Sequence, residues 1–447
     1  MNNVRNKFLF IIFILLLGCS FGLGGNVWND LSEELEKAKA RKNSKIIFST
    51  QKKFEDEIEN NKKILIESPI YNKDWIENNF SSNNNIPNLS YKNKKNLIFK
   101  SKKIGKNQFK ILNVDFEPLI ENENLYFYDP AGSIFSYSIK QKKVNWKFNF
   151  YKKRFKNIEK ILNISISLDS LIVSDNFGYV YNLNKNTGNI IWAKNFGVPF
   201  RSNIKIDGDN IFLINQDNKF YVISKRNGKQ MLDLETFPSF LKSDTKTNIS
   251  LDKINKNVYF ITSGAEIYSL NYKNRNINWL FNLTNLNIDQ QVDLFFSSPL
   301  IFKNNQIILS STSSTFSMNA TNGVLNWDFP VSTHILPIVL SNNIFLGTNK
   351  GFILNLNRDT GKVIWSRNLF SKLKKLKYEK TGDITSILFL SDTLLITSEK
   401  GYLIFLDYQN GRIINYIKIS SGFFSKPIVS NENIIIIDEK MRILQLN

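Results

Sequence analysis

The 447-residue chain contains a single cysteine, Cys19, and a single histidine, His334. A thiol can act as a nucleophile or carry a modification, and an imidazole can act as a general base near neutral pH. A Ser-His-Asp or Cys-His arrangement would have to use His334, which is better explained as a loop or strand-edge residue just before an expected strand. Structural zinc sites take about four cysteine or histidine ligands. We therefore predict no catalytic residue, no metal site and no cofactor, and a protein that is not an enzyme.

Cys19 ends a stretch typical of an export signal. A basic start precedes an apolar run over residues 8–17, which is too short to cross a bilayer as a helix. The residues Leu-Leu-Gly-Cys resemble a bacterial lipobox, in which cleavage precedes the cysteine and the thiol receives lipid. This resemblance implies a signal peptide over residues 1–18, a lipid on Cys19 and, from Ser20, sorting to the outer membrane. An ordinary signal peptide with an accidental cysteine is the alternative.

Two distant stretches, residues 178–192 and 351–365, have nearly the same sequence: GYVYNLNKNTGNIIW and GFILNLNRDTGKVIW. Each predicts a strand, a turn and a second strand, because β-branched and aromatic residues flank a cluster of Asn, Thr and Gly. Their identical Gly-to-Trp spacing indicates an internal repeat.

Weaker copies bring the number of units to eight, at intervals of 38 to 50 residues, a period that suits four short strands. Runs that start at Pro299, Pro337 and Pro427 predict the other hairpin of a unit. We therefore predict an all-β fold, an eight-bladed β-propeller of four-stranded antiparallel blades over residues 94–447. The residues that mark the repeat are Gly132, Trp146, Gly178, Gly188, Trp192, Trp279, Gly323, Trp327, Gly351, Gly361, Trp365, Gly401 and Gly411.

The repeated tryptophan is expected at the start of the outermost strand of each blade. Packing between neighbouring blades explains it best, and a ring of binding tryptophans is the alternative. The last unit lacks a fourth strand, since its tryptophan would fall beyond residue 447. Residues 97–101 form an expected strand without a hairpin partner, so we predict that they pair with residues 442–446 and close the ring, which removes exposed sheet edges.

The region before the propeller, residues 19–93, is expected to hold the lipid anchor, a tether with a short helix over residues 30–42, and a segment that wraps the propeller. Its apolar runs at 46–48 and 64–66 are expected on the propeller wall. Acids and bases balance over residues 19–75, so the formal net charge of +20 lies mostly on the propeller. The lysine- and asparagine-rich composition accounts for part of this charge, which is not concentrated in one arm or helix. No nucleic-acid-binding motif occurs, so we predict no nucleic-acid partner.

The repeat pattern Gly-hydrophobic-x-x-Leu-Asn-x-x-Thr-Gly-x-x-x-Trp resembles the PQQ-like repeat of quinoprotein propellers. With the lipobox and eight repeats, the chain resembles the BamB family of lipoproteins in the bacterial β-barrel assembly machinery. The segment around Trp75 resembles, loosely, the stretch that precedes the propeller in part of that family. The resemblance implies a monomeric, non-enzymatic scaffold on the periplasmic face of the outer membrane. It would bind the BamA-like insertase and other assembly subunits, and would aid the folding and insertion of outer-membrane protein clients.

In that family the contact residues lie in two inter-blade loops on one face, and the matching loops here are residues 232–248 and 283–299. The family's Asp-x-Asp before the proline is not reproduced, and its Leu-x-Leu-Arg motif has no counterpart. The expected partner-binding residues are Asp289, Asp293, Leu294, Phe295 and Phe296.

Two other functions fit the same fold. A quinoprotein dehydrogenase resembles the repeat, but many such enzymes carry a vicinal cysteine pair at the cofactor, and this chain has one cysteine. An envelope lipoprotein that binds a glycan or an unrelated protein remains open from the sequence, because the repeat specifies the fold and not the partner.

Overall fold

The structure is a computed structural model that describes residues 54–60, 62–109, 115–152, 155–237, 246–283, 296–311, 313–371 and 376–447. The chain divides into two compact units, Met1–Lys52 and Lys53–Asn447. The predicted signal peptide, Cys19 and the expected helix over residues 30–42 lie outside the described residues. Among those described, no helix is both long and apolar enough to cross a membrane.

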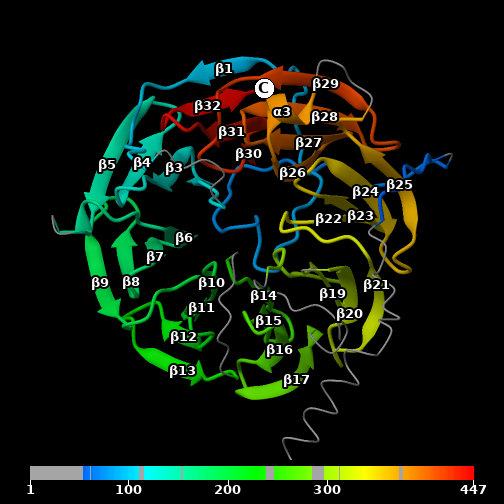
Figure 1. Ribbon diagram of the computed structural model, residues 1–447. Helices are drawn as coiled ribbons and strands as arrows, with labels where there is room; N and C mark the ends of the chain where they lie inside the picture. The colour runs from blue at the N-terminus through cyan, green and yellow to red at the C-terminus, as the bar shows by residue number, and fades with distance from the viewer. Residues whose placement is uncertain are drawn as a thin grey trace, which may run out of the picture. The chain divides into compact units, whose positions relative to one another are not determined.

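The described strands form eight four-stranded antiparallel sheets arranged as blades around a central axis (Figure 1). Blade 1 consists of β2 (Leu119–Glu121), β3 (Asn124–Tyr128), β4 (Ser133–Ser138) and β5 (Lys143–Asn149). Blade 2 consists of β6 (Leu162–Ser167), β7 (Ser170–Asp175), β8 (Tyr179–Asn184) and β9 (Ile190–Asn195). Blade 3 consists of β10 (Lys205–Asp207), β11 (Asn210–Ile214), β12 (Phe220–Ser224) and β13 (Gln230–Leu234). Blade 4 consists of β14 (Ile249–Asp252), β15 (Asn257–Ile261), β16 (Glu266–Asn271) and β17 (Asn276–Asn282).

The second half of the ring repeats the arrangement. Blade 5 consists of β18 (Ile301–Lys303), β19 (Gln306–Ser310), β20 (Thr315–Asn319) and β21 (Leu325–Phe329). Blade 6 consists of β22 (Ile338–Leu340), β23 (Asn343–Gly347), β24 (Phe352–Asn357) and β25 (Val363–Asn368). Blade 7 consists of β26 (Ile384–Leu390), β27 (Thr393–Ser398), β28 (Tyr402–Asp407) and β29 (Ile413–Lys418). Blade 8 consists of β30 (Ile428–Ser430), β31 (Asn433–Ile437), β32 (Ile443–Leu446) and β1 (Leu97–Lys100), and one short helix, α3 (Tyr378–Thr381), lies between blades 6 and 7.

The N-terminal strand closes the ring as predicted. Leu97 pairs with Leu446 and Lys100 with Leu444, so β1 is the outermost strand of blade 8. The backbone N–H of Ser101 continues the pairing with a 2.9 Å bond to the carbonyl of Ile443. The eight-bladed all-β fold expected from the repeat is therefore confirmed.

Burial follows the order of the strands in each blade. The inner three strands are buried on both faces, as in β4, where every residue is buried, because neighbouring blades cover them. The outermost strands face solvent along one side, as in β5. The inner strands are accordingly continuous runs of apolar and small residues, whereas an outer strand such as β5 alternates lysine and asparagine with larger apolar side chains.

Each repeated tryptophan contacts the next blade. The indole Nε1 of Trp146 donates a 2.8 Å hydrogen bond to the carbonyl of Lys185, in the turn between β8 and β9. A Cβ built on Gly188 in the same turn would lie 2.7 Å from that indole, so only glycine fits beneath it. The same pair recurs between the other blades that carry the tryptophan: Trp192 with Gly228, Trp279 with Gly323, Trp327 with Gly361, and Trp365 with Gly411.

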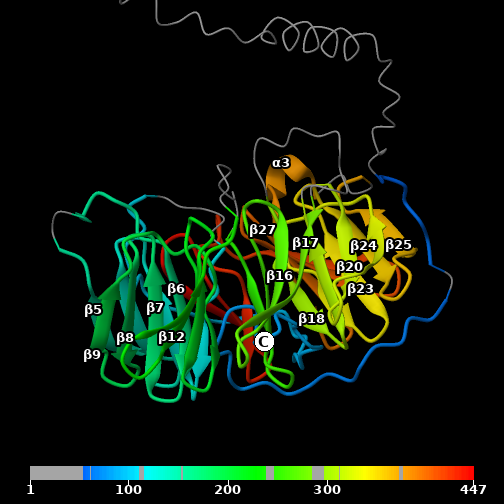
Figure 2. The same cartoon turned by 90° about the horizontal axis from the view of Figure 1, so that it is seen from below.

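The segment before β1 follows two surfaces of the ring. It first runs along the outside of blade 6, where Ile58 pairs with Ser366 next to the edge strand β25 and Ile64 is buried. Figure 2 shows this part, in blue, descending outside the ring and crossing the face opposite to α3. The expected position of residues 64–66 on the wall agrees with the burial of Ile64, whereas Leu65 is exposed.

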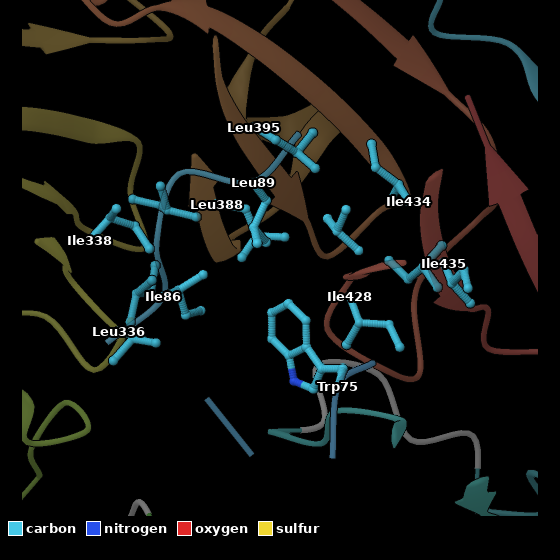
Figure 3. Close-up of a cluster of buried hydrophobic side chains, with 14 of the residues drawn as sticks. Trp75, Ile86, Leu89, Leu336, Ile338, Leu388, Leu395, Ile428, Ile434 and Ile435 are labelled. Atoms are coloured by element: carbon cyan, nitrogen blue, oxygen red, sulfur yellow. The ribbon is translucent and has the colours of Figure 1, made fainter. Parts of the chain in front are cut away.

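Residues 70–91 then enter the centre of the ring. Figure 3 shows Trp75, Ile86 and Leu89 among apolar side chains from blades 6, 7 and 8. Backbone bridges join Trp75 to Ile120 of blade 1 and Leu89 to Leu390 of blade 7. We name residues 70–91 the axial plug. Its buried part, which includes Trp75, Ile86 and Leu89, lies inside the propeller, whereas Ile70 and Tyr71 at its start are exposed. The sequence predicted only that residues 19–93 contain a segment wrapping the propeller.

Candidate functional site

All connections between blades emerge on one face of the propeller. Each blade has four antiparallel strands, so the end of its outermost strand and the start of the next innermost strand lie at the same end of the ring. Helix α3, which lies between β25 and β26, marks this face in Figure 2. We call it the connection face. Loops on a rigid scaffold are the usual carriers of binding function.

Two of the longest connections on this face are those named in the sequence analysis. They join β13 to β14, between Leu234 and Ile249, and β17 to β18, between Asn282 and Ile301. Of the predicted partner-binding residues, Asp289, Asp293, Leu294 and Phe295 lie outside the described residues.

Phe296 is described and is partly buried. Its carbonyl lies 3.4 Å from the hydroxyl of Ser311, and the next residue, Ser297, forms a β-bridge with Ser311. Phe296 is therefore the point where the connection returns to blade 5, at the rim of the connection face.

A cavity of about 600 Å³ opens at the centre of the connection face. It is lined by residues that precede the innermost strands of several blades. Those that carry charge or a titratable ring are Asp115, Glu159, Lys160, Arg201, Lys246, His334 and Lys426. The conformation of the blades thus brings together ionisable groups that are far apart in the sequence.

Two of the lining residues, Asp115 and Lys426, form an ion pair. Removal from bulk water acts to raise the pKa of the Asp115 carboxyl, but the ammonium groups of Lys426 and Lys246 outweigh it and hold that pKa well below its ordinary value. Desolvation acts to lower the pKa of Lys426, but Asp115 and Glu117 reverse this and raise it. Both members of the pair are therefore charged at neutral pH. Desolvation lowers the pKa of Lys246, which donates to the backbone carbonyl of Asp115.

The axial plug closes the channel beneath this cavity. Trp75 Nε1 and the backbone N–H of Asn79 both donate to Oε2 of Glu117, at 3.1 and 2.7 Å. Lys205, fully buried, lies 3.3 Å from a carboxylate oxygen of Glu77 and donates to the carbonyls of Asn78 and Ser81 at 2.8 and 2.5 Å. The channel is thus filled by protein on one side and open on the connection face.

Most of these cavity residues were not predicted from the sequence as site residues. His334 was assigned to a loop or strand edge, and the structure places it at the cavity wall before β22. Lys246 and Lys426 have the same relation to the repeat, two or three residues before an innermost strand. Their position within the repeat, shortly before an innermost strand, could have indicated from the sequence that they lie near the central axis, although no local motif marks that position.

The groups present do not fit the cofactor chemistry of quinoprotein enzymes that the repeat resembles. A vicinal cysteine pair needs two thiols, and the chain has only Cys19. In the part of the chain that the structure describes, no cluster of three His, Cys, Asp or Glu residues could hold a metal ion. The charged side chains that line the cavity can make polar contacts with a ligand or a partner segment.

Comparison with known sequences finds a matching family model and several relatives, some of them BamB proteins. A family model described as "Outer membrane protein assembly factor BamB" matches residues 130–367 and 289–447. An uncharacterized protein of Rickettsia prowazekii is 24% identical over 330 residues, 70% of this chain and 73% of the relative. The BamB proteins of Legionella pneumophila and Shewanella oneidensis are 22% and 29% identical over 160 and 138 residues, or 36% and 31% of this chain. These matches span only 39% and 33% of the two BamB proteins.

Solved structures agree on the fold. The crystal structure of BamB from Moraxella catarrhalis matches with a TM-score of 0.58 at 13% identity, over 78% of this chain and 96% of that one. A europium-containing methanol dehydrogenase matches with a TM-score of 0.62 at 10% identity, over 81% and 89% of the two chains. The fold is thus shared by assembly factors and by enzymes. The family model, unlike the fold, separates assembly factors from enzymes, and it matches most of the sequence through residue 447. The chain therefore belongs to the family of outer membrane protein assembly factor BamB.

Proposed function

We propose that this chain is a non-enzymatic scaffold of the β-barrel assembly machinery, which binds the periplasmic domains of a BamA-like insertase and assists the folding of outer-membrane proteins. Membership of the BamB family is the observation that carries the proposal. The closed ring of eight blades supports a scaffold role, because such a ring holds its loops on a rigid framework.

The connection face is the proposed contact surface. The connections from Leu234 to Ile249 and from Asn282 to Ile301 leave this face from adjacent blades, so a partner domain could contact both. The second contains Asp289, Asp293, Leu294, Phe295 and Phe296. Aromatic side chains are enriched at the core of protein interfaces, and polar residues surround them at the rim.

The test measures the affinity of the purified full chain for the periplasmic domains of the insertase from the same organism. The double change Phe295→Ala and Phe296→Ala, and separately Asp293→Ala, should each weaken binding by about tenfold, or about 1.4 kcal/mol. Phe237→Ala, which removes an exposed phenylalanine from the other connection of the same face, tests the contribution of that connection separately. Unchanged affinity in both loop variants, with tenfold weakening by Phe237→Ala, would move the interface to residues 232–248.

Envelope localisation is a further part of the proposal. Residues 1–18 would be removed, Cys19 would carry lipid and hold the chain at the periplasmic face of the outer membrane, and residues 19–93 would link the anchor to the propeller. Cys19→Ala should release the protein into the soluble periplasmic fraction and abolish labelling by a radioactive fatty acid. Labelling that persists in this variant would contradict lipidation at Cys19.

A further inference from the structure

The outer wall formed by blades 8 and 1 carries an unusual concentration of lysine. Residues 92–109 contain seven lysines and residues 139–150 contain four, and neither segment contains Asp, Glu or Arg. We call these lysines the basic wall: Lys92, Lys94, Lys95, Lys100, Lys102, Lys103, Lys106, Lys140, Lys142, Lys143 and Lys147. All of them are exposed except Lys95, which is partly buried.

The two segments are distant in the sequence and adjacent in the fold. Strand β1 is the outermost strand of blade 8 and β5 that of blade 1, and Figure 1 shows them following one another along the rim. The ammonium of Lys142 lies 5.2 Å from the ring centre of Phe99, which joins the two strands directly. The sequence predicted no concentration of charge in one arm or helix, and the two lysine-rich segments meet only when β1 closes the ring.

The basic wall has few acidic neighbours, although the charge of Lys147 acts on the carboxyl of Asp129. Among the described residues, no ion pair involves any of its lysines. Two carboxylates lie close to the two segments: Asp129, which is buried and accepts from the backbone of Lys106 and Ser133, and Glu432, which accepts from Ser90. Glu123, in the turn before β3, is the exposed acid beside Ile139.

Other outer walls differ in this respect. Blade 3 has Asp233 and Glu235 paired with Lys219. The wall of blade 6 is covered by the acidic stretch around Glu59, which lies 3.6 Å from Arg367. The corresponding outer hairpins of blades 2, 4 and 7, residues 185–196, 272–283 and 408–419, also lack acids but contain two basic residues each, against four in residues 139–150. The number of lysines therefore makes the basic wall a local feature.

We propose that the basic wall binds the surface of an anionic lipid bilayer. All eleven basic groups are lysines. Lysine is a hydrated point charge on a flexible stem, which suits diffuse attraction to a layer of headgroups, whereas arginine provides the fixed bidentate geometry for individual phosphate or carboxylate groups.

Exposed aliphatic side chains lie among these lysines and favour a bilayer over an acidic protein. Leu97, Ile98 and Val144 are 42%, 48% and 40% exposed. The pairing of β1 with β32 shifts register between Leu97 and Phe99, so Ile98 lies in a bulge of the edge strand. Apolar side chains that reach into the headgroup boundary, flanked by lysines, are the composition of a surface that lies on a membrane. This inference does not depend on the proposed insertase contact, which uses the connection face.

The test is vesicle flotation of the full chain carrying Cys19→Ser, so that no attached lipid contributes. Vesicles of phosphatidylcholine alone are compared with vesicles containing about 30% phosphatidylglycerol. The chain should bind only the anionic vesicles, and binding should weaken as salt screens the charges. The combined change of Lys140, Lys142, Lys143 and Lys147 to Gln should weaken binding by about tenfold.

A matched variant keeps the overall charge change constant. Lys194, Lys229, Lys253 and Lys273 are exposed lysines on blades 2 to 4, and their combined change to Gln should alter binding by less than about twofold. Equal losses in the two variants would overturn the proposal, as would equal binding to neutral vesicles. Unaltered melting temperatures in both variants exclude misfolding as a cause.

The contribution of an exposed aliphatic side chain to binding distinguishes a bilayer from an acidic protein as the partner. Ile98→Asn should weaken vesicle binding by about threefold and leave binding to poly-glutamate unchanged. If Ile98→Asn has no effect on vesicle binding, or weakens both equally, the basic wall is a general site for polyanions and the assignment to lipid is wrong.

Discussion

The indole of Trp365 lies on Gly411 of the following blade, so closely that a Cβ on Gly411 would be 2.5 Å from Cζ3 of the ring. Gly411 also has a φ of +69°. Where a blade lacks the tryptophan, the following turn lacks the glycine: Leu232 of blade 3 precedes a turn that has Arg275, and Phe99 of blade 8 lies beside Lys142. The two residue types therefore form one interblade joint and occur together.

Gly411→Ala should lower the free energy of unfolding by about 2–4 kcal/mol, because it adds a steric clash with a buried ring to an unfavourable backbone conformation. Gly197→Ala is the matched control. Gly197 has a φ of +79° but no atom within 4 Å of an added Cβ, so this change should cost only about 1–2 kcal/mol. Chemical denaturation compares the two. Equal costs would mean that the indole does not restrict Gly411.

Trp365→Ala should cost about 3–5 kcal/mol, the range for large-to-small aromatic changes in cores. Trp365 is fully buried, since the segment around Ile58 covers its strand, whereas Trp192 has no such cover and is only partly buried. The repeat pattern alone predicts equivalent positions for the two tryptophans. We expect Trp192→Ala to cost measurably less in the same denaturation experiment, and equal costs would show that the covering segment adds nothing.

The sequence predicted the blades because their periodicity is local. The spacing of glycine and tryptophan in each hairpin specified eight units, and the missing partner of β32 indicated which strand closes the ring. What the sequence left open was the identity of the contacts: the tryptophan of one unit meets the glycine of the next, a relation that no single repeat contains.

The axial plug and the central cavity could not be predicted in this way. The plug is rich in Asn and Ser, which is typical of a loop, and it is held by side chain–backbone bonds to blades that follow it by more than a hundred residues. The cavity takes its charged groups, such as Asp115, Lys246 and Lys426, from different connections. Only the assembled ring shows that these groups meet.

Asn84 tests the contribution of the axial plug to stability. Its side-chain amide is fully buried and donates to the carbonyls of Ile249 and Leu300, at 2.9 and 2.7 Å. Asn84→Gly keeps the positive φ of 58° accessible but leaves both carbonyls without this donor, so it should cost about 2–3 kcal/mol. Asn93→Gly, at an exposed asparagine with a φ of 57°, should be near neutral. Equal melting temperatures for the two variants would contradict a structural role of the plug.

The pH dependence of stability should reveal the buried carboxyl of Glu117. Burial raises its pKa, although the Lys426 charge and the bonds from Asn79 and Trp75 oppose the rise. A raised pKa in the folded state means that the stabilising contribution is complete below the unfolded pKa of about 4.3 and is lost as the pH rises through the folded pKa. Glutamine remains neutral and can still accept both bonds. Glu117→Gln should therefore have little effect near pH 4 and should raise the melting temperature at neutral pH.

Glu439 provides a control of opposite sign. Burial acts to raise the pKa of its carboxyl, but hydrogen bonds from Ser421 and Ser420 outweigh it and lower that pKa. Its stabilising contribution is present above the unfolded pKa and is lost as the pH falls through the folded pKa. Glu439→Gln should therefore lower the melting temperature at neutral pH, and the difference from wild type should shrink as the pH is lowered through the titration of this carboxyl. If Glu117→Gln instead changes the melting temperature equally at both pH values, Glu117 has no raised pKa, and its bonds to the axial plug are those of an ordinary ionised carboxylate.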